Sequence, residues 1–133
     1  EVQKNSSMAI NAINTISEKV HDNALQQELS KQKLWYSVIQ NKATDRLQNE
    51  RAEEYHASAM QDLMLKGGIQ MNTFTNCSTS KIAELMIQGS NRGITSMWKS
   101  MNHHQNSGNL SMEVAKELVD FEQKSIARLK KFL

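Results

Sequence analysis

The sequence predicts an all-α fold, an up-and-down bundle of four long helices with an additional helical segment. Its 133 residues contain no proline and only five glycines, which leaves little turn chemistry for a multi-stranded sheet. Good helix formers such as Leu, Met, Ala, Gln, Glu and Lys are abundant. Apolar residues recur at spacings of three and four, so they share one face of a helix. Because this length suits one hydrophobic core, we expect residues 1–133 to form a single helical-bundle domain.

The amino-terminal part of the chain contains two amphipathic segments. The first covers about residues 3–21 and the second about residues 24–48, with Asp22-Asn23 as the break between them. Another break is expected within residues 49–53, where the apolar stripe changes its direction. The expected stripes are Ala9, Ile13, Ile16 and Val20 in the first segment, and Leu25, Leu29, Gln32, Tyr36, Ile39, Ala43 and Leu47 in the second.

Three further segments follow. Residues 54–75 form either a separate helix or part of a crossover. A helix of about residues 79–104 is expected to begin at a cap supplied by Ser78, Thr79 or Ser80. The polar stretch 105–109 predicts a turn before a last helix of about residues 111–132. The expected stripes are Ile82, Met86, Gly89, Gly93, Met97 and Met101 in the fourth segment, and Ala115, Val119, Glu122, Ile126, Leu129 and Leu133 in the last.

Composition narrows the classes of function. The chain has 16 Lys+Arg against 14 Asp+Glu, a formal net charge of +2, which argues against a nucleic-acid partner. No stretch approaches the roughly 18 consecutive apolar residues of a membrane span, and the first residues do not resemble a secretory signal. We therefore expect no membrane partner and a cytoplasmic protein. The single cysteine, Cys77, cannot form an internal disulfide.

Several short stretches carry a family resemblance. They are Met71-Asn72-Thr73 and residues 78–90 (STSKIAELMIQGS), with Glu1-Val2, Lys4-Asn5 and Met8 at one end and Phe121-Glu122, Ile126 and Leu129-Lys130-Lys131 at the other. Together they resemble an uncharacterised family of small helical-bundle proteins of Gram-positive, largely spore-forming bacteria. The resemblance implies a ferritin-like helical arrangement and no particular activity. Asn76 replaces a usual acid and Lys81 replaces a common histidine, and these two changes argue against a metal site of the family. A proline-containing loop after the second helix is also missing.

Polar residues on the apolar stripes are the first candidate site. Glu122 lies on the stripe of the last helix, where a carboxyl group must be paired, hydrogen-bonded, protonated or metal-bound. Gln32 and Tyr36 occupy the equivalent place on the second helix. We expect a buried polar network of Gln32, Tyr36 and Glu122 that fixes the register of the helices, and a raised pKa for Glu122 if desolvation outweighs its hydrogen bonds.

A metal site is the alternative interpretation of the acidic residues. Glu53 and His56 have the Glu-x-x-His spacing found in di-iron bundles, where two helices each supply such a pair and two more each supply a glutamate. With Glu84 and Glu122 they are the candidate ligands. The only other pair with this spacing, Glu18 and His21, falls at a helix end, so the set is too small for a di-iron site. We expect no cofactor.

Gly89 and Gly93 are predicted to be helix-packing residues, because small residues one turn apart let another helix approach closely. Ile87, Ile94 and Trp98 spread beyond the stripe of the same helix, which predicts a homodimer through helix faces. No catalytic motif is found. The sequence therefore favours a non-enzymatic binding or structural module of unknown partner, and the alternative is a ferritin-like metal-binding or redox protein.

Overall fold

The computed structural model describes residues 1–49, 78–104 and 109–133, and within these ranges the chain is helical and contains no strand. The predicted all-α fold is confirmed. The segment 54–75, whether a helix or part of a crossover, lies outside the described residues. The helices are α1 (Val2–Ser17), α2 (Asn23–Asn49), α4 (Thr79–His103) and α5 (Asn109–Leu129), followed by a 3-10 turn, Lys130–Phe132.

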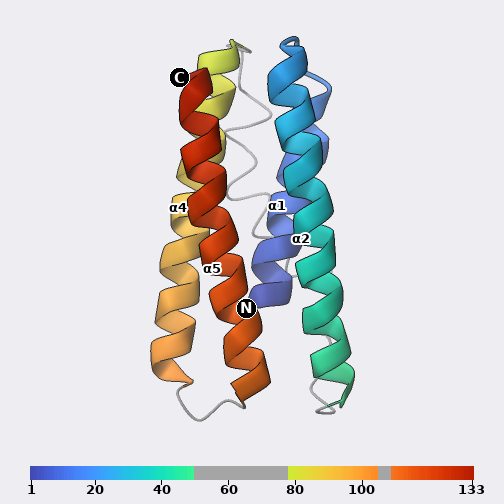
Figure 1. The fold of residues 1–133 in the computed structure, drawn as a ribbon, viewed down its shortest axis with the longest axis vertical. Coiled ribbons are helices and arrows are strands. Elements are labelled where there is room, and N and C mark those ends of the chain that lie inside the picture. Colours follow the sequence, from blue (N-terminus) through green and yellow to red (C-terminus); the bar gives the residue numbers. More distant parts are fainter. Residues whose placement is uncertain (50–77, 105–108) are drawn as a thin grey trace.

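The four helices lie side by side (Figure 1). α1 packs against α2, α4 packs against α5, and α2 and α5 join the two pairs. α1 and α5 run in one direction, whereas α2 and α4 run in the other (Figure 1). α2 therefore ends at one end of the molecule, and α4 begins at the opposite end.

Side-chain caps and short turns explain where the helices begin and end. The Asp22 carboxylate accepts a hydrogen bond of 2.8 Å from the Leu25 amide at the start of α2. Ser78 is the N-cap of α4, and its hydroxyl accepts a hydrogen bond of 3.2 Å from the Lys81 amide. α1 is shorter than the expected 3–21. It ends at Ser17, because the next amides bond three residues back instead of continuing the helix.

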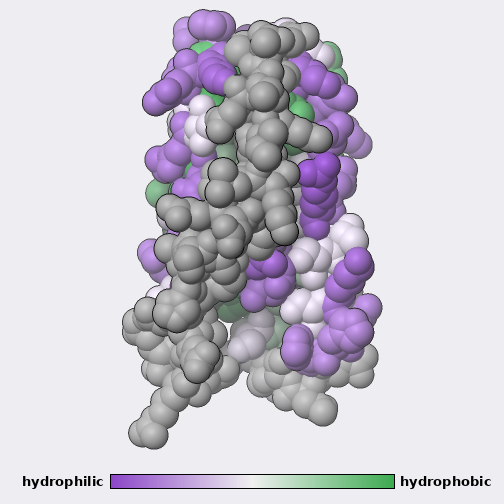
Figure 2. All heavy atoms as spheres, turned by 180° about the vertical axis from the view of Figure 1, so that it is seen from behind, coloured by the Kyte–Doolittle hydropathy of each residue, from purple (hydrophilic) through white to green (hydrophobic). Residues whose placement is uncertain are grey.

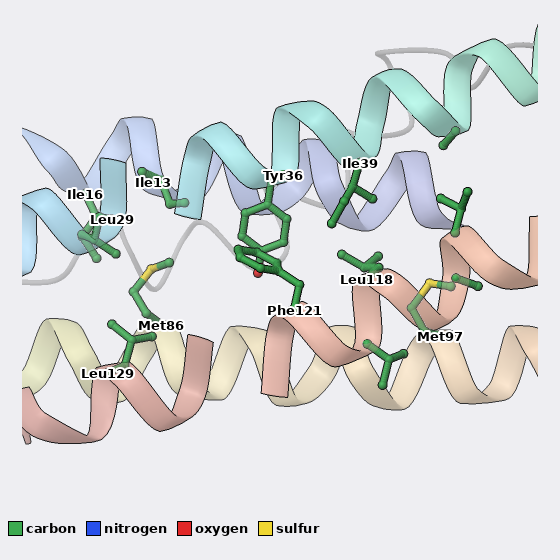
Figure 3. Packing of buried hydrophobic residues seen from close by; sticks show 14 of the residues in the cluster. Ile13, Ile16, Leu29, Tyr36, Ile39, Met86, Met97, Leu118, Phe121 and Leu129 are labelled. Carbon is green, nitrogen blue, oxygen red and sulfur yellow. The ribbon is translucent and has the colours of Figure 1, made fainter. Parts of the chain in front are cut away.

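The core follows the predicted stripes. Figure 3 shows Tyr36 and Phe121 meeting between α2 and α5, with Leu29 and Leu129 toward one end and Ile39 and Leu118 toward the other. The Tyr36 and Phe121 rings meet edge to face, with 4.9 Å between their centroids. The stripe of α2 is buried from Leu25 to Ala43 as predicted. α5 buries a second row that was not predicted: Val114, Leu118, Phe121 and Ser125.

The outer surface is largely polar. On the face shown in Figure 2, the visible side chains of the described residues are mostly hydrophilic, with hydrophobic groups between them.

The stripe predicted for the last helix is wrong in one residue, Leu133, which is exposed beyond the end of the core. None of the helices described has the length and apolar character that crossing a membrane requires.

Candidate functional site

Glu122 of α5 is buried in the middle of the molecule, with only 2% of its surface exposed. The Tyr36 hydroxyl, from α2, donates a hydrogen bond of 3.4 Å to Glu122 Oε1. Glu122 Oε2 has no hydrogen-bond partner among the described residues. The structure thus brings together two of the three residues of the expected polar network across the α2–α5 contact.

Gly93 of α4 makes room for this carboxyl group. A Cβ atom at Gly93 would lie 2.5 Å from Glu122 Oε1 and 2.8 Å from Oε2, closer than atoms that are not bonded can approach. The Asn5 side chain of α1 donates a hydrogen bond of 3.4 Å to the Gly93 carbonyl, and Ser90 hydrogen-bonds to the Tyr36 side chain. One polar layer, consisting of Asn5, Tyr36, Ser90, Gly93 and Glu122, therefore crosses all four helices.

Burial shifts the proton affinity of both titratable groups in this layer. Desolvation raises the pKa of Glu122 from 4.5 to about 8, although the Tyr36 hydrogen bond acts to lower it. Desolvation also raises the pKa of Tyr36 well above its ordinary value, with a further contribution from the neighbouring Glu122 carboxylate. Glu122 can therefore hold a proton near neutral pH while it remains inside the core.

Gln32 belongs to a neighbouring network. It is buried, as expected, but its amide donates to Glu28 over 3.0 Å. Arg128 donates to the same carboxylate oxygen over 2.6 Å and to Ser125 over 3.3 Å. Its guanidinium lies 5.9 Å from the centroid of the Phe121 ring. The Glu28–Arg128 pair therefore links α2 to α5, and Gln32 supports it from within α2. Gln32 is hydrogen-bonded to Glu28 and not to Glu122.

The candidate metal ligands are only partly within the described residues. Glu84 is partly exposed and forms an ion pair of 3.0 Å with Lys81, one turn earlier on α4, whereas Glu122 is buried beside Tyr36. Glu53 and His56 lie outside the described residues. In the part of the chain that the structure describes, no three His, Cys, Asp or Glu side chains are grouped as metal ligands.

The two glycines of α4 have different surroundings. Gly93 is buried against the Glu122 carboxyl group, a side chain rather than the backbone of another helix. Gly89 is exposed, and a Cβ atom there would find no atom of the described residues within 4 Å. Close packing is thus seen at one glycine of the predicted pair, and Gly89 is not part of the buried stripe that was expected for α4.

The outer face of α2 carries an apolar patch that the sequence analysis missed. The patch consists of Leu34, Trp35 and Val38, which are 66%, 52% and 37% exposed. Three residues suggested a dimer face on α4. Ile87 and Ile94 are partly buried and pack against the core, whereas Trp98 is 48% exposed. The signal for the patch is the position of Leu34 and Val38 opposite the buried stripe, four residues apart on α2.

Comparison with known proteins does not add a relative: no family model, no curated protein and no solved structure matches the chain. The structure itself offers two features from which a function can be argued. One is the polar layer around Glu122, which is buried and hydrogen-bonded between helices. The other is the apolar patch on α2, which is open to solvent.

Proposed function

We propose that the chain is a non-enzymatic helical-bundle module that works by binding another polypeptide through the outer face of α2, and that it forms a homodimer. One observation carries this proposal: the α2 patch leaves Leu34 and Trp35 more than half exposed. Exposed apolar area costs free energy, about 25 cal/mol for each Å², and a contiguous patch on a polar surface is typical of an interaction site.

The buried polar layer supports the structural half of this proposal. Tyr36 and Glu122 connect α2 to α5, and Asn5 and Gly93 connect α1 to α4. Buried polar contacts of this kind favour one helix register, because any other register leaves the same groups without partners. A bundle with one fixed register presents the α2 patch in one defined position.

We also propose a ferritin-like arrangement for the bundle. Ferritin-like folds contain four helices in two antiparallel pairs, joined by one long crossover connection. The pairing of α1 with α2 and of α4 with α5 supports this arrangement. So do the parallel directions of α2 and α4 (Figure 1), because the chain between them must connect opposite ends of the molecule.

Removing the patch should remove self-association. We expect wild-type protein to show a concentration-dependent mass in sedimentation equilibrium between about 1 μM and 1 mM, the range of a weak interface. The variant Leu34→Gln/Val38→Gln should remain a monomer, because polar side chains gain nothing from leaving water. Its urea midpoint should stay close to that of the wild type, since both side chains are exposed.

Trp98→Gln provides the control for this experiment. Trp98 is also a large exposed side chain, 48% exposed, but it lies on α4. This variant should retain the association of the wild type. A wild-type protein that is monomeric over the whole range contradicts the proposal, as does a patch variant that associates as strongly as the wild type.

The alternative function is a ferritin-like metal-binding or redox protein that uses Glu53, His56, Glu84 and Glu122. The observation that favours it is Glu122 Oε2, a buried oxygen without a partner among the described residues. We expect protein purified without a metal-affinity step to contain no stoichiometric transition metal, because Glu84 pairs with Lys81 instead of approaching Glu122. Elemental analysis checks this. Iron or manganese at roughly two per chain, the content of a di-iron site, would favour the alternative.

A further inference from the structure

Leu34 and Val38 of the α2 patch belong to a longer exposed stripe along the same helix. Lys31, Leu34, Val38, Asn41 and Asp45 follow one another at alternating spacings of three and four residues, and all five are exposed. This alternation keeps side chains on one face of a helix and is the spacing of helices that pair in coiled coils. The stripe points away from the core, because Tyr36 and Ile39 on the same turns are buried.

The charges on this stripe are arranged around its centre. Val38 lies in the middle, with Lys31 seven residues before it and Asp45 seven residues after it. One end of the stripe is therefore positive and the other negative. Each charge lies about 10 Å from Val38 along the helix axis, at 1.5 Å per residue.

We propose that α2 pairs in antiparallel orientation with α2 of a second copy of this chain, with Val38 against Val38 on the two-fold axis and Lys31 against Asp45 at both ends. This inference rests on the proposed function, since it names the partner and the geometry of the α2 patch. A two-fold interface uses the same surface of both copies, and residues equally distant from its centre face one another. Both opposite-charge pairs then form at once.

The same charges disfavour a parallel pair. In parallel orientation Lys31 would face Lys31 and Asp45 would face Asp45, and like charges in contact oppose association. In the antiparallel pair, Leu34 lies opposite Lys42 of the other copy. The aliphatic stem of that lysine can cover the leucine while its ammonium group stays in water and keeps its ion pair with Glu117 of its own chain, which is 2.8 Å long.

Charge reversal tests this geometry. Lys31→Glu and Asp45→Lys should each weaken dimerisation about tenfold in sedimentation equilibrium, because each places like charges together at both ends. The double variant Lys31→Glu/Asp45→Lys reverses both pairs and should restore the wild-type dissociation constant. Lys33→Glu is the control: Lys33 is exposed but lies off the stripe, and this variant should dimerise like the wild type apart from a small effect of net charge.

A cysteine at the proposed axis provides an independent test. In a Cys77→Ser background, which removes the single native thiol, Val38→Cys should form an intermolecular disulfide under mild oxidation. Gln123→Cys, an exposed position on α5, should not. A dimer in which the double charge variant is not restored, or in which the Val38→Cys variant does not cross-link, overturns the antiparallel geometry but leaves self-association through α2 standing. A protein that is monomeric throughout overturns both.

Discussion

Replacing Glu122 with glutamine should remove the pH dependence that this buried carboxyl group gives to the stability of the protein. We expect the free energy of unfolding of the wild type to fall by about 3–5 kcal/mol as the pH rises from near 4.5 to near 8. In the Glu122→Gln variant this fall in the free energy of unfolding should be absent, because the glutamine side chain does not titrate. At pH 8 and above it should be more stable than the wild type.

The sign follows from the raised pKa of Glu122. Desolvation raises this pKa from 4.5 to about 8 in the folded protein, so the folded state binds a proton that the unfolded state has released. The proton's contribution to stability is complete below pH 4.5 and is lost as the pH rises to 8. Above that range the folded core contains a carboxylate with one hydrogen bond from Tyr36. Glutamine has a similar shape and carries no charge.

Urea unfolding at several pH values from about 4 to 9 measures this effect. Glu113→Gln is the matched control, because Glu113 is an exposed glutamate on the same helix. This variant should keep the pH dependence of the wild type. A large loss of stability in Glu122→Gln at neutral pH would contradict the account, since it would mean that Glu122 balances a buried cation or metal.

Gly93→Ala should be clearly destabilising, whereas the same substitution one turn earlier should not. A Cβ atom at Gly93 would meet both Glu122 oxygens, and moving the carboxyl group away breaks its hydrogen bond with Tyr36. Overpacking of this kind costs about 1–3 kcal/mol. Gly89→Ala is the control, because no described atom is close to that position, and alanine in a helix gains about 0.5–1 kcal/mol over glycine.

Thermal or urea unfolding of the two variants compares them directly. A double-mutant cycle with Glu122→Ala adds a test of the cause, because removing the carboxyl group removes the clash. Gly93→Ala should therefore cost less in the Glu122→Ala background than in the wild type. If the Gly93→Ala variant is as stable as the Gly89→Ala variant, the position of the Glu122 carboxyl group does not require a glycine at residue 93.

The helices and much of the core could be predicted from the sequence, because the positions of apolar residues along a helix determine which face is buried. The predicted stripes did not include the buried residues that lie beside them, such as Leu118 and Phe121 on α5. A helix with neighbours on two sides buries a wider face than one stripe. Small polar residues carry no periodic signal, so the burial of Ser6 and Ser7 on α1 was not predicted.

The candidate site was predictable one residue at a time but not as a set of contacts. Glu122 and Tyr36 stood out because they are polar residues on apolar stripes. The partner of Gln32 was not predicted, although Glu28 lies one turn earlier on the same helix and is therefore within its reach whatever the register between α2 and α5. The α2 patch was not predicted, because Leu34 and Val38 are two apolar residues among polar ones on the outer face of α2. The partial burial of Ile87 and Ile94 depends on the neighbouring helices, which their own helix does not reveal.

The most direct test of the proposed function is a dilution series of ¹H–¹⁵N correlation spectra of the unmodified protein. Residues at a self-association interface change their amide shifts as the dimer dissociates. We expect changes concentrated on the outer face of α2 between Lys31 and Asp45, with α4 around Trp98 largely unaffected. Spectra that do not change from about 10 μM to 1 mM, or changes centred on Trp98, would contradict it.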